Sequence, residues 1–293
     1  MGILQRSASI LGLVIMTGLV LHMYFRQKSL DVFEKAHTQQ AMLFGDSHAD
    51  NIPWPGAPRF SGPAQDLFSA LKMLEVFVEM RPSDSQIKTC VMTVWPHKFG
   101  PLAERRITGA VQGDQWGSMA LGRLAPLMTW NDLIRRDVPW KYRLRLAYHT
   151  LQLKTVHAWL DNDCDENSVD ADFKYGQSEQ VRFTQWFDQA HTTQHLFNSF
   201  VDLTSAQGWR LILVENPIHP CYYDLVNPDA LEAYDKFIAS AVERHGNAAF
   251  LQMGRENQDH TLFSDYHHLT CKGEALVEQR LRSLIGDQYP SRP

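Results

Sequence analysis

The sequence predicts an α/β protein in which helices cover a parallel β-sheet. Short apolar runs typical of buried strands alternate with longer segments whose apolar residues recur at helical spacing. Polar residues follow several of these strands directly, at the edge where open parallel sheets carry their functional groups. The chain has 293 residues, of which 44% are hydrophobic and 21% charged, enough for one sizeable core or two modest ones.

The first half of the domain is predicted as strand, helix, strand. Residues 41–44 form a short apolar run, which we interpret as the first strand. A turn at residues 61–63 precedes a helix predicted over residues 64–80, where leucine and valine recur at helical spacing. Residues 87–95 are apolar and β-branched, as expected of a central strand. This order implies a crossover connection and therefore a parallel pair of strands.

The second half of the domain returns to alternating strands and helices after a middle segment of another kind. Residues 104–207 contain glycine- and tryptophan-rich loops and two long helical patterns, which we interpret as a helical insertion in the α/β core. Two strands are then predicted at residues 209–215 and 248–253. Helices are predicted at residues 228–245 and 270–284, so the chain ends on a helix.

Residues 9–25 differ from the rest because they carry no formal charge apart from the titratable His22. At about 1.5 Å per helical residue, this run approaches the thickness of a bilayer core. No small-residue cleavage site follows, so we interpret it as an uncleaved transmembrane signal anchor; a cleaved signal peptide and a buried helix remain alternatives. The flanking positive charges are nearly balanced and do not give the orientation. The predicted parts are an anchor and stalk (1–40), a domain (41–287) and a tail (288–293).

The four cysteines show no metal-type spacing. Cys90 lies inside an apolar run and is predicted to be a buried thiol. Cys221 and Cys271 each lie near the predicted functional edge of the sheet, where they could pair in an oxidising compartment. Sequence does not supply disulfide connectivity, so that pairing remains one alternative.

A serine, a histidine and an aspartate stand where an α/β fold places functional groups. Ser47 follows the first strand in a Gly-Asp-Ser sequence, and Asp265 and His268 precede the last helix. A serine attacks a carbonyl at neutral pH only when a base removes its proton and a carboxylate orients that base. We therefore assign Ser47 as nucleophile, His268 as general base and Asp265 as its orienting acid. The alternatives are a helix-capping serine and an exposed polar loop, and His267 is a rival base.

The two motifs together resemble the SGNH (GDSL-like) hydrolase superfamily, in which Gly-Asp-Ser follows the first strand and Asp-x-x-His lies near the C-terminus. That spacing selects His268 rather than His267, and Leu269 and Gly273 also match the family's pattern. The resemblance implies a flavodoxin-like parallel sheet sandwiched by helices, with a Ser-His-Asp triad. It implies no cofactor and no metal.

The family stabilises the oxyanion of its intermediate with donors from three sequence blocks. The backbone N–H of Ser47 is the first candidate donor, and Gly62, which stands before a predicted helix, matches the second block. The third block departs from the family, because Pro-His-Lys follows the strand at residues 87–95 where Gly-x-Asn-Asp is expected. His97 is the candidate replacement, and Asn216, which follows a later strand, is another.

The resemblance implies serine-dependent acyl transfer through an acyl-enzyme. Water as the second nucleophile gives an esterase, and a sugar hydroxyl gives an O-acyltransferase; the triad does not distinguish them. Anchored relatives with a degraded third block include proteins that move acyl groups onto envelope polymers. We therefore expect a periplasmic or otherwise extracytoplasmic domain that acts on an O-acylated, most readily acetylated, carbohydrate or a small ester. The alternative is a catalytically weak SGNH-fold binding or assembly subunit beside a membrane acyltransferase.

Other signals in the chain are weaker. Residues 161–172 alternate acids as in a Ca²⁺ loop but lack the required Gly and final Glu, so we interpret them as a solvated loop. His191 and His195 have helical i, i+4 spacing and are predicted to be surface residues. A metal-dependent hydrolase using these groups is a third alternative. The net charge of −5, without a long Lys/Arg run, gives no reason to expect a nucleic-acid partner.

Overall fold

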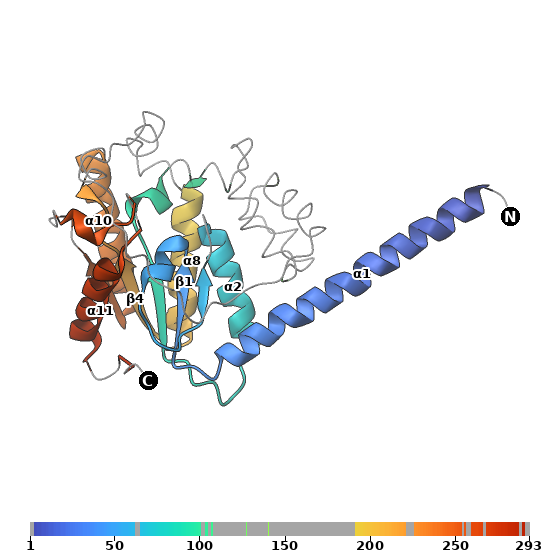
Figure 1. The fold of residues 1–293 in the computed structure, drawn as a ribbon, viewed down its shortest axis with the longest axis horizontal. Helices are drawn as coiled ribbons and strands as arrows, with labels where there is room; N and C mark the ends of the chain where they lie inside the picture. Colours follow the sequence, from blue (N-terminus) through green and yellow to red (C-terminus); the bar gives the residue numbers. More distant parts are fainter. Residues whose placement is uncertain are drawn as a thin grey trace.

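The computed structural model describes residues 3–61, 65–100, 191–220, 226–253, 259–265 and 268–286, together with single positions elsewhere. Its centre is a five-stranded sheet in the order β2-β1-β3-β4-β5, in which every neighbouring pair is parallel (Figure 1). The order 2-1-3-4-5 is the doubly wound order of flavodoxin-like proteins. The predicted α/β class and parallel sheet are therefore confirmed.

Four strands agree with the predicted ones to within two residues, and a fifth is missing from the prediction. The strands are β1 (Ala41–Gly45), β2 (Arg59–Ser61), β3 (Thr89–Thr93), β4 (Arg210–Glu215) and β5 (Ala248–Gln252). The missing strand is β2, whose three residues are too few to show a pattern of alternation. It lies at the end of the sheet, where pairing with β1 and not its own sequence determines its conformation.

The helices are α1 (Ile3–Ala36), α2 (Leu67–Glu79), α8 (His191–Ala206), α10 (Pro228–His245) and α11 (Cys271–Ile285), with short 3₁₀ helices η1 (Ser47–Asn51), η2 (Pro96–Phe99) and η6 (His260–Leu262). Polar side chains begin three of them by accepting a backbone N–H that has no partner within the helix. Asp66 caps α2 in this way, Asn227 caps α10 and Thr270 caps α11. These caps explain why the predicted helix starts lie close to the observed ones.

The sheet separates two apolar layers, because successive residues of a strand point to opposite faces. Phe44, Met92 and Leu213 face the layer formed by α2, α8, α10 and the end of α1. Leu43 and Val91 face the other layer, which contains α11. Both faces are covered, which explains why the strands are continuously apolar and do not alternate with polar residues.

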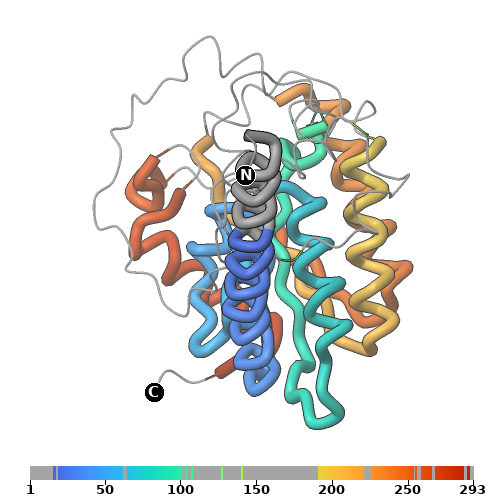
Figure 2. Tube along the Cα trace, turned by 90° about the vertical axis from the view of Figure 1, so that its right-hand side faces the viewer, coloured from blue at the N-terminus to red at the C-terminus, as the bar shows by residue number. Residues whose placement is uncertain are grey.

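The last part of the expected insertion belongs to the core. Helix α8 connects toward β4 and packs against α2, α10 and β4, so residues 191–206 form part of one helical layer. Figure 2 shows α2 and α8 side by side, near the lower end of α1. Most of residues 104–190, including much of the two long helical patterns expected in the insertion, lie outside the described residues.

Helix α1 has one end in the domain and extends away from it at the other (Figure 1). Phe33 stacks on Phe60 with ring centroids 4.9 Å apart, and His37 stacks on Phe77 at 3.8 Å. Farther toward the N-terminus, large apolar side chains are exposed: Met16, Leu19, Val20, Leu21, Met23 and Tyr24. Within the part of the chain whose side chains are described, no helix is long and apolar enough to span a membrane.

A close approach between β1 and β3 predicts a strict requirement for glycine at position 45. A Cβ on Gly45 would lie 2.0 Å from Thr93 Oγ1 and 3.3 Å from Thr93 Cβ, so Gly45→Ala must displace the Thr93 side chain or the strand that carries it. We expect this change to lower the free energy of unfolding by about 1–3 kcal/mol, measured by urea denaturation. Gly100→Ala is the matched control, because its Cβ would lie 3.4 Å from the nearest atom, the His97 carbonyl oxygen. Equal effects of the two changes would contradict this explanation.

Candidate active site

Ser47 lies directly beyond the carboxyl end of β1, as the first residue of η1. Asp46 precedes it and caps η1 by accepting the backbone N–H of His48 at 3.1 Å. This cap turns the chain sharply as it leaves the sheet, and it leaves Ser47 partly exposed while both neighbours are buried. The capping role that is the alternative for Ser47 is thus performed by Asp46.

Asp265 and His268 form a tight turn just before α11. One oxygen of the Asp265 carboxylate accepts the backbone N–H of His268 at 2.7 Å, and the other lies 2.6 Å from His268 Nδ1. An antiparallel bridge between Phe263 and Leu269 closes the loop behind them. The three-residue spacing therefore lets one carboxylate fix both the backbone and the ring of the histidine.

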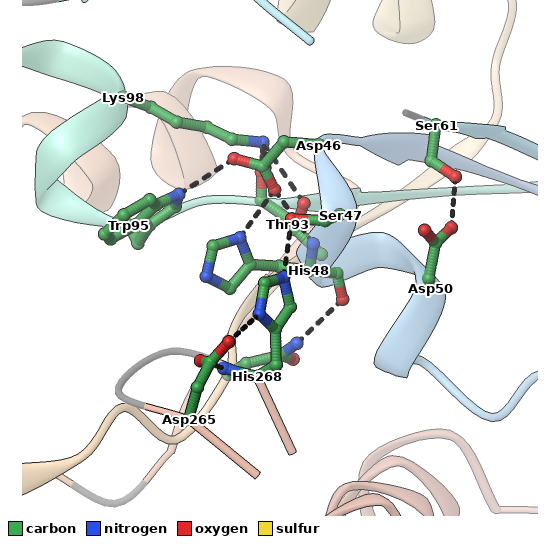
Figure 3. A network of polar contacts seen from close by, with 11 residues as sticks. Asp46, Ser47, His48, Asp50, Ser61, Thr93, Trp95, Lys98, Asp265 and His268 are labelled. Atoms are coloured by element: carbon green, nitrogen blue, oxygen red, sulfur yellow. Dashed lines mark hydrogen bonds and ion pairs between the residues drawn. The ribbon is translucent and has the colours of Figure 1, made fainter. Parts of the chain in front are cut away.

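The two segments meet at Ser47. His268 Nε2 lies 2.8 Å from Ser47 Oγ, and Figure 3 shows Asp265, His268 and Ser47 connected in sequence. Because Nδ1 donates to the ionised carboxylate, the proton of a neutral ring sits on Nδ1 and Nε2 is left as an acceptor. Ser47 can therefore donate its hydroxyl proton to His268, which is the geometry of a nucleophile, a base and an orienting acid.

A second group of polar side chains lies beside Ser47 and centres on the buried carboxylate of Asp46 (Figure 3). His48 Nδ1 lies 2.7 Å from Asp46 Oδ1, and the indole N–H of Trp95 donates to Oδ2 at 3.1 Å. Lys98 Nζ approaches the same carboxylate at 3.7 Å. The ring of His48 also stacks on His268 with centroids 5.6 Å apart, so the two groups are in contact.

These contacts determine the charges of the buried pair. Burial alone would raise the pKa of Asp46, but the charges of His48 and Lys98 and the hydrogen bonds from His48 and Trp95 hold that pKa well below its usual value. Burial lowers the pKa of Lys98, and the neighbouring Asp46 opposes that effect. Asp46 is therefore an anion in the core, with a lysine ammonium as its neighbour.

Short polar contacts join η1 to four surrounding elements. Asp46 connects it to the loop after β3 through Trp95 and Lys98. On the side of β2, Ser61 donates to Asp50. Two further contacts reach β4 and α11: the Asn216 amide donates to the His48 carbonyl at 2.9 Å, and Asn51 donates to Glu274 at 2.9 Å. The backbone that carries Ser47 is therefore held from several directions.

Of the expected oxyanion donors, the structure describes Ser47, His97 and Asn216 but not Gly62. The backbone N–H of Ser47 lies at the start of η1, next to its own Oγ. Gly62 lies outside the described residues, and so does the rival base His267. His97 is half-buried in η2 with its ring 4.8 Å from that of Trp95, and one amide hydrogen of Asn216 is used by His48. The roles of Gly62, His97 and Asn216 therefore remain predictions.

Sequence reasoning missed the importance of Asp46, His48, Trp95 and Lys98. The one signal in the sequence was the segment after β3, where Pro-His-Lys stands in place of the Gly-x-Asn-Asp expected from the SGNH resemblance. Lys98 folds back to donate to the Thr93 carbonyl at 2.8 Å, and this reversal depends on the turn of η2. No spacing rule predicts that contact, because it joins a side chain to the end of its own preceding strand.

Two more histidines lie near this edge of the sheet. His260 Nδ1 is 2.7 Å from His219 Nε2, and burial, followed by the charge of His260, lowers the pKa of His219. His191 and His195 are exposed on α8, as predicted. Among the residues with described positions, no three His, Cys, Asp or Glu side chains gather in a way that could hold a metal ion. The acidic segment at 161–172 lies outside them.

The cysteines differ in state. Cys90 is a free, buried thiol, as predicted, and burial raises its pKa well above the usual value. Cys271, the first residue of α11, is disulfide-bonded. Its partner lies outside the described residues, as does Cys221, so the pairing of these two remains a prediction.

The low pKa of Asp46 predicts a defined dependence of stability on pH. A carboxyl whose pKa is lower in the folded than in the unfolded chain stabilises the fold above its unfolded pKa of about 3.9, and this contribution is lost as the pH falls toward the folded pKa. Asp46→Asn should lower the free energy of unfolding by about 3 kcal/mol at neutral pH. In urea titrations, the difference in free energy of unfolding between wild type and Asp46→Asn should become smaller between about pH 5 and pH 3. A difference that stays constant with pH would contradict an ionised Asp46.

Comparison with protein-family models and with curated proteins gives no match for this chain.

Proposed function

We propose that the protein is an SGNH-type serine esterase or O-acyltransferase that works through an acyl-enzyme. The observation that carries the proposal is the Ser47–His268–Asp265 arrangement, with its contacts of 2.8 and 2.6 Å. Three groups from opposite ends of the chain meet in the order that activates a serine hydroxyl. The placement at the carboxyl edge of a parallel sheet supports the same conclusion.

The proposed reaction has two halves. Ser47 Oγ attacks the ester carbonyl while His268 Nε2 accepts the hydroxyl proton and Asp265 stabilises the resulting imidazolium. Collapse of the tetrahedral intermediate breaks the bond to the leaving alcohol, which takes the proton from His268. In the second half, His268 deprotonates water or a sugar hydroxyl, which attacks the acyl-enzyme. The bond from the acyl carbon to Ser47 Oγ then breaks, and His268 returns the proton to Ser47. Water makes the reaction a hydrolysis, and a sugar hydroxyl makes it an acyl transfer.

The developing oxyanion needs fixed donors, and the loss of one typically slows such reactions by about 10²–10³-fold. The N–H of Ser47 is held at the start of η1 by the surrounding contacts. Gly62 and His97 are the further donors that we propose. Neither a metal nor a cofactor is needed for these steps.

We further propose that the domain lies outside the cytoplasm on a membrane anchor and that its substrate is an acylated, most readily acetylated, envelope carbohydrate. A disulfide at Cys271 supports an oxidising compartment, because such bonds are rare in the cytosol. The apolar side chains exposed on α1, among them Leu19 and Met23, belong to the uncharged run of residues 9–25. The choice of carbohydrate rests on the family resemblance alone.

A binding or assembly subunit of a polysaccharide acylation system is the second candidate. It is favoured by the loop after β3, where Trp95 and Lys98 contact Asp46 and the family's Gly-x-Asn-Asp is replaced. A subunit of this kind would keep its biological role without Ser47. Complementation of a deletion strain by Ser47→Ala would therefore favour the second candidate.

Labelling by a fluorophosphonate tests for an activated serine. We expect stoichiometric labelling of wild type at Ser47, read by intact mass and peptide mapping. Ser47→Ala and His268→Ala should reduce labelling and ester hydrolysis by about 10⁴-fold or more, because the triad acts as a unit. Ser264→Ala and His260→Ala are matched controls that alter neighbouring residues of the same types and should still be labelled. A folded wild type that resists labelling would count against an enzyme.

Flotation with liposomes tests the membrane anchor. The full chain should float with the vesicles, because residues 9–25 and the exposed side chains of α1 provide an apolar surface. A chain lacking residues 1–26 keeps Phe33 and the docked end of α1, and it should remain in the dense fraction. If the full chain also remains in the dense fraction, at both low and high salt, the prediction of a membrane anchor is wrong.

A further inference from the structure

Lys98 is a buried cation beside the turn that carries Ser47. Its side chain is 7% exposed, although it belongs to a short helix that follows a strand. Nζ donates to the Thr93 carbonyl oxygen at 2.8 Å and to Thr93 Oγ1 at 3.1 Å, and it lies 3.7 Å from Asp46 Oδ1. Burying a lysine is costly unless a partner compensates its charge, so this placement calls for an explanation.

The charge of Asp46 supplies that explanation. Its carboxylate is buried and belongs to the residue next to Ser47, whose backbone N–H is the first proposed donor to the oxyanion (Figure 3). An uncompensated negative charge there would oppose the second negative charge that develops during attack. Trp95 donates a hydrogen bond to Asp46 but carries no charge. The His48 ring, whose Nδ1 lies 2.7 Å from Asp46 Oδ1, contributes a positive charge only when it is protonated, and Lys98 brings a second basic group to the same carboxylate.

We propose that Lys98 is a positioning residue that acts through Asp46: it balances the buried carboxylate so that Asp46 can hold the Ser47 turn without opposing the oxyanion. Asp46 anchors the turn, and Lys98 makes that anchor electrostatically neutral. The loop after β3 thereby contributes to the reaction through charge balance. This role rests on the proposed function, because it concerns the charge that develops when Ser47 attacks.

A charge-balancing role of Lys98 and a purely anchoring role can be separated, because each predicts that a different variant loses most of the labelling rate at Ser47. If the side chains around Asp46 only anchor the turn, Asp46→Asn should slow labelling most, since the contacts from His48, Trp95 and Lys98 all end on the Asp46 carboxylate. If Lys98 balances charge, Lys98→Met should slow labelling most, because it removes the lysine charge and leaves only the His48 ring to compensate the carboxylate. Adding Asp46→Asn to Lys98→Met then removes the repulsion and should restore much of the rate.

The experiment measures the second-order rate of fluorophosphonate labelling at Ser47 in the full chain, with the folded fraction determined for each variant. Lys98→Met should be about 10- to 30-fold slower than wild type, as expected for one unit charge several ångströms away in a partly polar site. Asp46→Asn should lose about threefold, and the double variant should lie within about fivefold of wild type. Lys98→Arg keeps the charge and should be faster than Lys98→Met.

Trp95→Phe is the matched control for the hydrogen bond, because it removes a donor to Asp46 without changing any charge. Its Ser47 should be labelled faster than that of Lys98→Met. Equal losses in Trp95→Phe and Lys98→Met, or a double variant no faster than Lys98→Met, would overturn the charge-balancing role. If Lys98→Met does not fold, Asp46→Asn decides: a loss of tenfold or more contradicts the proposal.

Failure of this inference differs from failure of the proposed function. A wild type that is never labelled overturns the serine chemistry itself. If wild type is labelled but Asp46→Asn is slower than Lys98→Met, the serine chemistry stands. Only the charge-balancing role of Lys98 is then wrong.

Discussion

The contact between Ser47 Oγ and His268 Nε2 joins residues 221 positions apart in the chain, and the proposed chemistry depends on it. It can form only if the carboxyl end of β1 and the start of α11 reach the same edge of the sheet. The parallel order places β1 inside the sheet, between the edge strand β2 and the central strand β3. Packing of Val277 and Leu281 against the sheet places α11 on one face, with the Asp265 turn directly before it.

Close packing at the start of α11 is part of the same constraint. A Cβ on Gly273 would lie 2.3 Å from the Leu262 carbonyl oxygen, so only glycine lets the first turn of α11 approach η6. The turn with Asp265 and His268 lies between these two helices. Backbone proximity therefore sets the position of the base, and the Asp265 carboxylate sets its orientation.

The serine turn is organised differently, through a buried anion. Asp46 makes three contacts with two residues, His48 and Trp95, and an ionised acceptor makes such bonds stronger than neutral ones. A buried anion also carries a cost, since it must be compensated where the reaction develops negative charge. Lys98 lies where that compensation is needed, with its remaining donors satisfied by Thr93.

Local patterns were enough to predict most of the fold, and together with the family resemblance they predicted that Ser47, Asp265 and His268 would meet. Four strands, the ends of α10 and the meeting of Ser47 with His268 follow from apolar runs, capping residues and the rule that parallel strands share a functional edge. Strand β2 could not be predicted, because its conformation comes from pairing with β1. Lys98 and Trp95 could not be assigned to Asp46 either, because these contacts depend on how η2 turns and not on any spacing.

The most direct test is rapid-quench mixing of the full chain with p-nitrophenyl acetate, followed by peptide mapping of the quenched protein. If Ser47 forms the acyl-enzyme, a burst of p-nitrophenol equal to the amount of folded protein is expected, with the acetyl group on the peptide that contains Ser47. This acetyl group should disappear as the ester is exhausted, since water completes the cycle. Release of p-nitrophenol without an acetylated Ser47, in a folded and pure sample, would contradict an acyl-enzyme at this site.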